Sequence, residues 1–537
     1  PGGSFDFAGL TTDNVERIEI VRGPGGVLYG SDAVTGVINI ITRQGGGGGA
    51  PRVSAGLSAG TYDSWSASAG LVGGGGAVAY SASLSRFGSR GLYPINNRYA
   101  NATATGSLRF RPDGYTDARL SLRYSDAAFH FPTDGAGRIA DANQRQADAV
   151  STVSVDAGRL LTPRLEARVL LATHRVNARS DDLPDQLDPF EFRSHEVVKR
   201  SSADARVNLR LPRGTVITGG AVVEDERERT GNTFSPETLI TRSSWAAYAQ
   251  MVTEVASVGL DAGVRREDNA AYGRFATYRL GASYRVAPNI RLRATFATGF
   301  KEPTFFENYA SGFVVGNPGL DPERSRSWEV GLERTLLGGR VVLAGTYFDQ
   351  RFRDLIEFTF APPAPGDPNY FNVAGALARG VELSATAGPV GAGDGPALAA
   401  HYTWLQTETV DTALDGGTDG QFALGQRLLR RPTHSGTVAL WYRWDLVRLQ
   451  TSAAYVGDRT DLDFAGFPAT RVVLPAYLRL DLGVEVEVIR PSAPGRGPGF
   501  TGTIRVENAL DRRYEEALHF PARRRVVFLG GRVDFGR

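Results

Sequence analysis

Residues 15–43 read VERIEIVRGPGGVLYGSDAVTGVINIITR, and the fold of the whole chain follows from this stretch. It opens with an alternating segment around Ile18 and Ile20, which is typical of a short β-strand. The cluster Gly23-Pro24-Gly25-Gly26 predicts a tight turn, because proline fixes one φ angle and glycine accepts positive ones. The β-branched run at residues 37–41 predicts a buried strand. A β unit this small cannot form its own core, so it needs a larger partner.

The remainder of the chain, from residue 51 to the end, has the pattern of such a partner. Segments of about ten alternating residues are separated by connections that are short and long in turn. Short connections are expected at residues 111–114, 211–214, 286–289 and 337–339, and long ones at 126–146, 179–193, 227–241, 301–324, 411–426 and 458–470. At about 22 residues per strand with its connections, the pattern predicts roughly 22 strands of a transmembrane β-barrel. Two packed soluble sandwiches would also contain many short strands, but they would not need alternating turn lengths.

Composition excludes several classes of function. The 537 residues contain no cysteine, so disulfides, thiolate metal sites and cysteine nucleophiles are excluded. The net charge of +2 does not indicate a basic surface that would bind nucleic acid. No stretch approaches the roughly 20 apolar residues of a membrane-spanning helix. No Gly-x-Ser-x-Gly, Walker loop or His-Glu-x-x-His sequence is present, so we do not expect an enzyme.

Several segments, taken in chain order, resemble one protein family. VERIEIVRGP, LYGSDAVTGVINI and ITR are similar to the end of the plug domain of TonB-dependent outer-membrane receptors. Residues 301–325 with the strand at 328–333, residues 370–382 and residues 506–514 are similar to three later segments of these receptors. The resemblance implies an all-β fold: a 22-stranded antiparallel transmembrane β-barrel with the carboxyl-terminal part of a plug domain inside it. Residues 1–46 would be the plug part, 47–50 a glycine-rich linker and 51–537 the barrel, with the last strand at 526–535.

The resemblance also implies a function and its partners. It predicts a monomeric receptor in the bacterial outer membrane, surrounded by outer-membrane lipid, for active uptake of a scarce chelate of the cobalamin or ferric siderophore class. The energy would come from the TonB–ExbB–ExbD complex, acting through an amino-terminal plug segment that we expect to be missing, since the chain starts at Pro1 without a signal peptide. Haem is disfavoured because no histidine lies between residues 303 and 317. The alternative is a passive, porin-like channel, against which the plug sequence argues.

A latch between plug and barrel is the sharpest prediction for a site. Alternation sends the apolar residues of 328–332 toward lipid and Glu329 into the lumen, and the same logic directs Glu382 inward. Arg22 ends a plug strand just before the Gly-Pro turn, and an arginine packed against a barrel wall needs carboxylate partners. In receptors of this family, the matching positions form a charge cluster between plug and barrel. We therefore expect Arg22, Glu329 and Glu382 to meet, the alternative being that each has a separate local partner.

Two candidate sites are predicted in the long loops. Phe305, Phe306, Tyr309 and Phe313 crowd one loop, where they could bind a large, partly apolar ligand or pack against neighbouring loops. The loop at residues 180–191 carries Asp181, Asp182, Asp185 and Asp188, and the resemblance implies calcium there, because cobalamin transporters carry calcium-binding aspartates at a similar place. The alternative for this loop is an ordinary solvated acidic surface. No other cofactor is expected.

Overall fold

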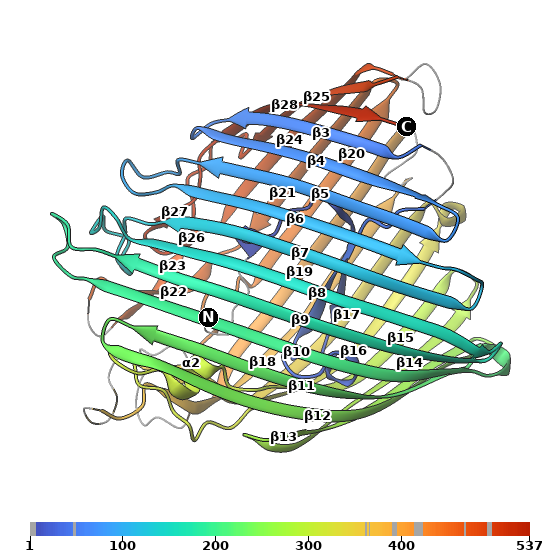
Figure 1. Cartoon of the computed structure of the whole chain (residues 1–537), viewed down its shortest axis with the longest axis horizontal. Helices are drawn as coiled ribbons and strands as arrows, with labels where there is room; N and C mark the ends of the chain where they lie inside the picture. The colour runs from blue at the N-terminus through green and yellow to red at the C-terminus, as the bar shows by residue number, and fades with distance from the viewer. Residues whose placement is uncertain are drawn as a thin grey trace.

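The chain forms a closed barrel of 22 antiparallel strands (Figure 1), which confirms the predicted fold class. This computed structural model describes residues 7–46, 50–359, 362, 364, 366–388, 395–412, 423–466, 469–490 and 497–536. The barrel closes where the last strand pairs with the first, with Phe528 opposite Gly60 and Phe535 opposite Val53. Closure leaves no barrel strand with an edge that faces the membrane, because every barrel strand pairs with two neighbours.

The barrel strands differ in length from 9 to 21 residues. They are β3 (Arg52–Gly60), β4 (Ser64–Gly75), β5 (Val78–Ser89), β6 (Tyr99–Phe110), β7 (Thr116–His130), β8 (Arg145–Thr162), β9 (Leu165–Asp182), β10 (Phe192–Arg210), β11 (Val216–Asn232), β12 (Ser235–Val255), β13 (Val258–Asn269), β14 (Gly273–Ala287), β15 (Ile290–Lys301), β16 (Glu323–Leu336), β17 (Val341–Phe358), β18 (Tyr370–Ala387), β19 (Gly395–Thr412), β20 (His434–Trp444), β21 (Val447–Val456), β24 (Tyr477–Ile489), β25 (Gly499–Glu507) and β28 (Val526–Phe535). Because about 9–11 residues cross the hydrocarbon layer, the longest strands continue well beyond the membrane.

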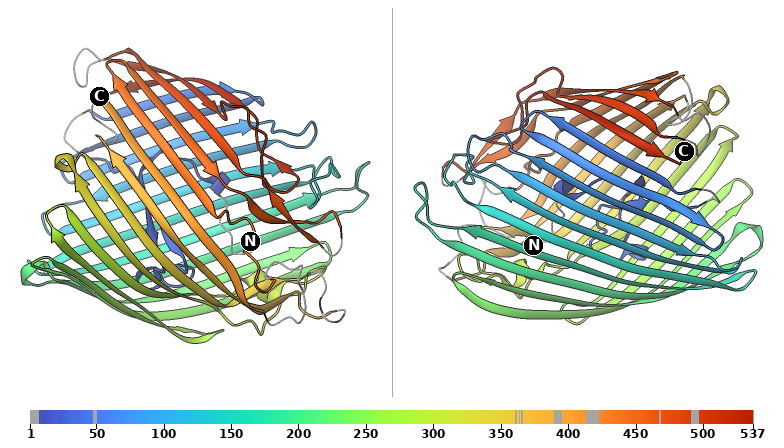
Figure 2. Two further views of the ribbon diagram at one scale, coloured as in Figure 1. Left: turned by 180° about the vertical axis from the view of Figure 1, so that it is seen from behind. Right: turned by 45° about the horizontal axis from the view of Figure 1, so that its top comes forward.

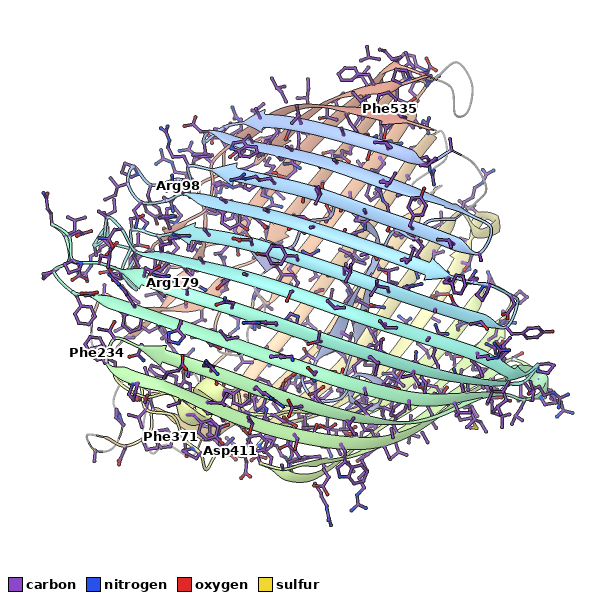
Figure 3. All side chains as sticks on the ribbon, in the orientation of Figure 1. Arg98, Arg179, Phe234, Phe371, Asp411 and Phe535 are labelled. Carbon is purple, nitrogen blue, oxygen red and sulfur yellow. The ribbon has the colours of Figure 1, made fainter. Side chains whose placement is uncertain are left out.

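The two ends of the barrel differ in their connections. One end has turns of a few residues, some of them short 3₁₀ turns (η2, Pro212–Gly214; η3, Leu337–Gly339), and it faces the periplasm. The other end carries the long loops, the hairpin of β22 (Arg459–Asp463) and β23 (Thr470–Leu474), and the small hairpin of β26 (Glu515–Ala517) and β27 (Phe520–Pro521). Strand β28 has the predicted bounds and ends at the periplasmic rim, where Phe535 is labelled in Figure 3.

One predicted long loop is wrong. Residues 227–241 are not a loop, because β11 continues to Asn232 and β12 resumes at Ser235 after a two-residue turn. The pairing runs without interruption through Arg227 opposite Thr241 and Glu228 opposite Ile240. Charged residues on both faces disguise this extension, because a strand that rises above the membrane has water outside and an aqueous lumen inside.

Side-chain direction follows the predicted alternation. Trp328, Val330 and Leu332 are 42–49% exposed on the outer face, while Glu329 and Glu382 face the lumen side. Of the aromatic residues near the rim, Trp245 is 50% exposed on the outside, but Tyr248 is buried and donates its hydroxyl to Asp204. Among the described residues, no helix is long and apolar enough to cross a membrane.

The plug part is a hairpin inside the barrel (Figure 2), with a short 3₁₀ turn before it (η1, Phe7–Gly9). Strand β1 (Val15–Arg22) pairs with β2 (Gly36–Thr42), and the one-turn helix α1 (Gly26–Tyr29) lies between them. Gly23 takes the positive φ expected of the turn, at +74°, whereas Gly26 already belongs to α1. The described plug ends at residue 46; most of the predicted linker, residues 47–49, lies outside the described residues.

Residues 37–41 form the predicted strand, within β2, but the prediction that this strand is buried is wrong. Ile38 is 48% exposed and its cross-strand neighbour Ile20 is 66% exposed. The cause is the size of the sheet: β1 and β2 form a sheet of two strands, and the described part of the chain supplies no second layer that would cover it. β-branching therefore reports strand conformation here, but not burial.

Candidate functional site

The predicted latch joins Arg22, at the end of β1, to the barrel strand β18. The Arg22 Nη1 atom forms an ion pair and hydrogen bond with Glu382 Oε2. The Glu382 side chain is 22% exposed, and that of Arg22 is 58% exposed. Arg22 is the last residue of β1, and the Gly23-Pro24 bend that follows fixes the direction of the backbone from which its side chain starts.

Glu329 lies beside this pair, but among the described residues it forms no hydrogen bond with Arg22. Its carboxylate lies instead against the plug turn: a Cβ atom added to Gly23 would come 2.6 Å from Glu329 Oε1. The charged side chains near Glu329 are those of Arg22, Arg279, Arg293 and Glu382. The structure thus brings together two of the three predicted residues in a direct bond and places the third against the backbone of the turn.

A second contact of the plug, which the sequence did not predict, follows α1. The Asp32 amide donates to the Phe300 carbonyl at 3.1 Å, and the Asp32 carboxylate is 3.6 Å from the Arg200 guanidinium. Two barrel side chains, Ser325 and Gln350, donate to the Val34 carbonyl at 2.8 and 2.9 Å. The apex of the plug is therefore fixed to β10, β15, β16 and β17. No sequence signal marked these residues, because most of the bonds use the plug backbone.

The opposite side of the plug is held by neutral hydrogen bonds. Asn14 donates to Thr105 Oγ1 at 2.9 Å, and Ser81 donates to the Arg43 carbonyl at 2.7 Å. Asn101 donates to the Gly9 carbonyl at 3.1 Å. These hydroxyl and amide groups line the barrel wall on β5 and β6. Water can replace each of these hydrogen bonds when the plug moves. The apex also buries three small apolar residues, Val27, Ala33 and Val34, against the barrel.

The lumen wall near the plug apex is a dense ionic cluster. Arg265 Nη2 lies 2.7 Å from Glu267, and Arg200 Nε lies 2.8 Å from Glu224. Arg242 pairs with Glu226 and lies 3.8 Å from Glu302. Glu302 opens the long loop before α2 (Phe305–Tyr309), and burial raises the pKa of its carboxyl to about 7. The cluster connects the plug seat to the base of an extracellular loop.

The four predicted aromatic residues of that loop separate into two groups. Phe305 is buried, with the Arg242 guanidinium 4.4 Å from its ring centre, so it supports the lumen wall. Phe306 and Tyr309 are about 40% exposed, and Phe306 meets Tyr370 edge-on at 6.2 Å. Phe313 is 72% exposed and belongs to an aromatic cluster from three loop segments.

That cluster was missed by the sequence reasoning. The Phe313 ring is 5.1 Å from Phe234, at the tip of the β11–β12 hairpin, and 5.9 Å from Phe190 in the loop before β10. Phe190 also stacks on Phe234 at 5.5 Å. Phe234 is labelled at the extracellular edge in Figure 3. Sequence could not join these residues, because the contact depends on how far the hairpin rises above the membrane.

The acidic loop at residues 183–191 contributes to a carboxylate cluster whose members differ from the prediction. Asp182 and Asp188 meet Asp141, which comes from the loop before β8, with carboxylate oxygens within 4.8 Å of one another. Asp181 points outward and bonds Arg179 at 2.8 Å. Asp185 accepts hydrogen bonds from the backbone amides at residues 142, 187 and 188. Neither of these two belongs to the cluster.

Two oxygens of this cluster are buried without a hydrogen-bond partner. They are Asp141 Oδ2 and Asp182 Oδ1, from side chains that are 4% and 7% exposed. Asp182 is the last residue of the 18-residue β9, so it lies outside the membrane. Burial and the neighbouring Asp141 raise the pKa of the Asp182 carboxyl to about 7. Such a pair of facing carboxylates needs either a shared proton or a cation.

These features define a class of protein: an outer-membrane transport barrel whose lumen holds a separate, hydrogen-bonded plug. Comparison with known proteins gives the family. The family model of the TonB-dependent receptor-like β-barrel matches residues 47–508, and that of the TonB-dependent receptor plug domain matches residues 1–37. The chain belongs to the TonB-dependent receptor family, whose members are outer-membrane transport proteins and not enzymes.

Curated relatives and solved structures agree with this assignment. The vitamin B12 transporter BtuB of Vibrio cholerae is 26% identical over 540 residues, covering 98% of this chain and 80% of that protein. The protein of the same name from Photobacterium profundum is 27% identical over 492 residues, covering 89% and 74%. The ferripyoverdine receptor of Pseudomonas aeruginosa superposes with a TM-score of 0.79 at 14% identity, covering 98% and 77%. The siderophore receptor PirA of Acinetobacter baumannii also gives 0.79 at 14% identity, covering 99% and 87%.

Proposed function

We propose that this receptor takes up a chelate of the cobalamin or ferric siderophore class, driven by the TonB–ExbB–ExbD complex, and that it acts as a monomer. The observation that carries the proposal is the plug seat. A lumen of 22 strands would conduct if it were open, and the plug part is held in it by hydrogen bonds and ion pairs together with a small apolar contact around Val27. A plug that is fixed but releasable suits gated transport better than passive diffusion.

The polar contacts suggest how the plug is released. Each plug–barrel hydrogen bond contributes about 0.5–1.5 kcal/mol net, because water replaces it when it breaks. A pull on the plug therefore opens the seat in small steps, beginning with the exposed Arg22–Glu382 pair, and exposes only the small apolar contact of Val27, Ala33 and Val34. The barrel strands keep their own ladders throughout, because the plug hairpin is a separate sheet.

The ligand class is tested by binding to the purified receptor. Cyanocobalamin is the first probe, because the curated relatives named above are vitamin B12 transporters. Ferric siderophores of the catecholate and hydroxamate types are the others. We expect one of these chelates to stabilise the folded receptor by RT ln(1 + [L]/Kd), which raises the midpoint of thermal unfolding, and its metal-free or truncated form to raise that midpoint less. If none of these chelates binds, the ligand class is wrong.

The porin alternative is tested by conductance in planar bilayers. The receptor with its plug should show no steady open channel, and moderate urea should produce openings as the polar seat is weakened. A constant large conductance without urea would favour the porin.

We also propose calcium at the cluster of Asp141, Asp182 and Asp188. Calcium takes 6–8 oxygen ligands, and three carboxylates from two loops supply several of them. The two buried oxygens support a cation here, because neither has a hydrogen-bond partner among the described residues. Titration calorimetry on the purified receptor tests this: Asp182→Asn should abolish the calcium heat and Asp181→Asn should retain it. Equal heats from the two variants, or no heat from the wild type, would contradict the proposal.

A further inference from the structure

Three cations lie in a row on the outside of the barrel. The register places Lys199 of β10 directly opposite Arg175 of β9 on one side and Arg227 of β11 on the other. Neighbouring strands are about 4.8 Å apart, so the three side chains start within about 10 Å of one another. All three are exposed. Like charges at directly opposed positions destabilise a sheet, so this arrangement calls for an anion.

The row faces outward, not into the lumen. The adjacent residue on each strand points into the lumen. His174 forms a hydrogen bond with Thr152, and Arg200 pairs with Glu224 of the lumen cluster. Glu226 is buried and pairs with Arg242. Because side chains alternate strictly along a strand, residues 175, 199 and 227 must lie on the opposite face.

On β11 the row lies beyond the last outward apolar position. On β11 the outward apolar positions run up to Val223, which is 57% exposed and opposite Trp245. Arg227 is four residues further toward the cell exterior, which is about 13 Å along the tilted strand. An exposed tryptophan marks the boundary between hydrocarbon and headgroups. The cations therefore lie at the level of the outer-leaflet headgroups, and Figure 3 labels Arg179 further along β9 toward the loops.

The row carries more positive charge than its neighbours neutralise. Arg227 bonds Asp225 at 2.8 Å. Arg175 and Lys199 have no carboxylate partner among the residues that the structure describes. Two unpaired cations beside a third are retained at a boundary where the surrounding molecules are lipids, which makes a lipid-borne anion the fitting occupant.

We propose that this row binds the phosphate of an outer-leaflet lipid. Guanidinium groups bind phosphate oxygens through two parallel hydrogen bonds, and an ammonium between them adds a point charge. Directly below Lys199, the outward positions on β10 are the small residues Ser201 and Ala203, and Ala203 lies between Leu171 and Val223. The cations match the headgroup of one lipid, and the small residues below them leave room for its acyl chain.

The experiment uses the receptor in detergent with a defined probe, diphosphorylated lipid A, and its dephosphorylated counterpart. Native mass spectrometry counts retained lipids, and thermal unfolding measures stabilisation. The test variant is Arg175→Gln/Lys199→Gln/Arg227→Gln. The control Arg164→Gln/Arg213→Gln/Arg340→Gln removes the same charge from exposed periplasmic turns.

The wild type and the control should retain the phosphorylated lipid with at least tenfold preference over the dephosphorylated one, and the test variant should lose that preference. High salt should reduce it in the wild type. Equal retention by test and control variants would overturn the proposal, and so would equal stabilisation by free inorganic phosphate. If the triple variant does not fold, Lys199→Gln alone should reduce the preference at least threefold. The absence of any reduction would also overturn the proposal.

Discussion

Replacing Arg22 with alanine removes the ion pair between the plug hairpin and Glu382 without touching the barrel ladders. The magnitude follows from exposure. Exposed ion pairs contribute about 0.2–1 kcal/mol, and the Arg22 side chain is 58% exposed. Glu382 is only 22% exposed, so losing its partner costs more than at an open surface. We expect the free energy of plug displacement to fall by about 1 kcal/mol, which is about a fivefold increase in the displaced population.

Hydrogen exchange measures this displacement. The amides of β1 and β2 exchange when the plug part leaves its seat, so their opening free energy should fall by about 1 kcal/mol in Arg22→Ala. Amides of barrel strands such as β28 should keep their protection. The matched control is Arg17→Ala on the same strand, because Arg17 is 52% exposed but pairs with Glu16 and Glu19 of the plug itself. The control should leave exchange of the hairpin nearly unchanged.

A double-mutant cycle with Glu382→Ala isolates the pair. The coupling energy should be about 0.5–1 kcal/mol, and Glu382→Ala alone should have a similar effect to Arg22→Ala. The latch is refuted if the coupling is zero, or if Arg22→Ala and Arg17→Ala change exchange of the hairpin equally. A loss of protection in the barrel strands as well would show a global defect and not a loosened plug.

Four other predictions concern the extracellular side. Calcium affinity should fall about tenfold per pH unit below about pH 7, because the raised pKa of Asp182 means that calcium must displace a proton; calorimetric titrations from pH 5 to 8 measure it. In the same calcium-free protein, stability should fall as pH rises from about 4 to 7, since the folded state then holds the extra proton. Tyr309→Ala/Phe313→Ala should weaken uptake of the chelate at unchanged amounts of folded barrel, and unchanged uptake would leave both residues as loop packing. Asp461→Asn should cost about 3 kcal/mol in loop stability, because this fully buried carboxylate pairs with an arginine at 2.9 Å; limited proteolysis of the loops measures it.

The barrel could be predicted because one physical rule repeats along it. A wall between lipid and an aqueous lumen forces side chains to alternate, and closure forces antiparallel neighbours, so the strand at residues 526–535 was predicted with its observed bounds. The rule fails where lipid ends. Residues 227–241 have water on the outer face as well as on the lumen side, so their strand carries charges on both faces and reads as a loop.

The acidic site shows a different limit. Asp182 and Asp188 were evident as a local group, but Asp141 is 41 residues before Asp182. Their meeting depends on the pairing of β8 with β9, which sets Arg145 opposite Asp181 and brings the ends of two loops together. The sequence shows which acidic residues are close along the chain. The site is formed by those acidic residues that lie at strand ends of the same height on the barrel wall. Asp181, one residue from Asp182, faces outward for the same reason of alternation.

The polar character of the plug seat could not be predicted from the β-branched plug sequence, and the structure shows the reason. Ile18, Ile20 and Ile38 lie on a hairpin whose described contacts with the wall are made by other atoms, chiefly backbone carbonyls such as that of Val34. If the isoleucines were packed against the barrel, withdrawing the plug would expose apolar area at about 25 cal/mol per Å². Hydrogen bonds to hydroxyl and amide groups can be exchanged for water one at a time. Many such bonds together keep the plug in place against thermal motion. A directed pull can still remove it, because breaking any one bond and replacing it with water costs little free energy.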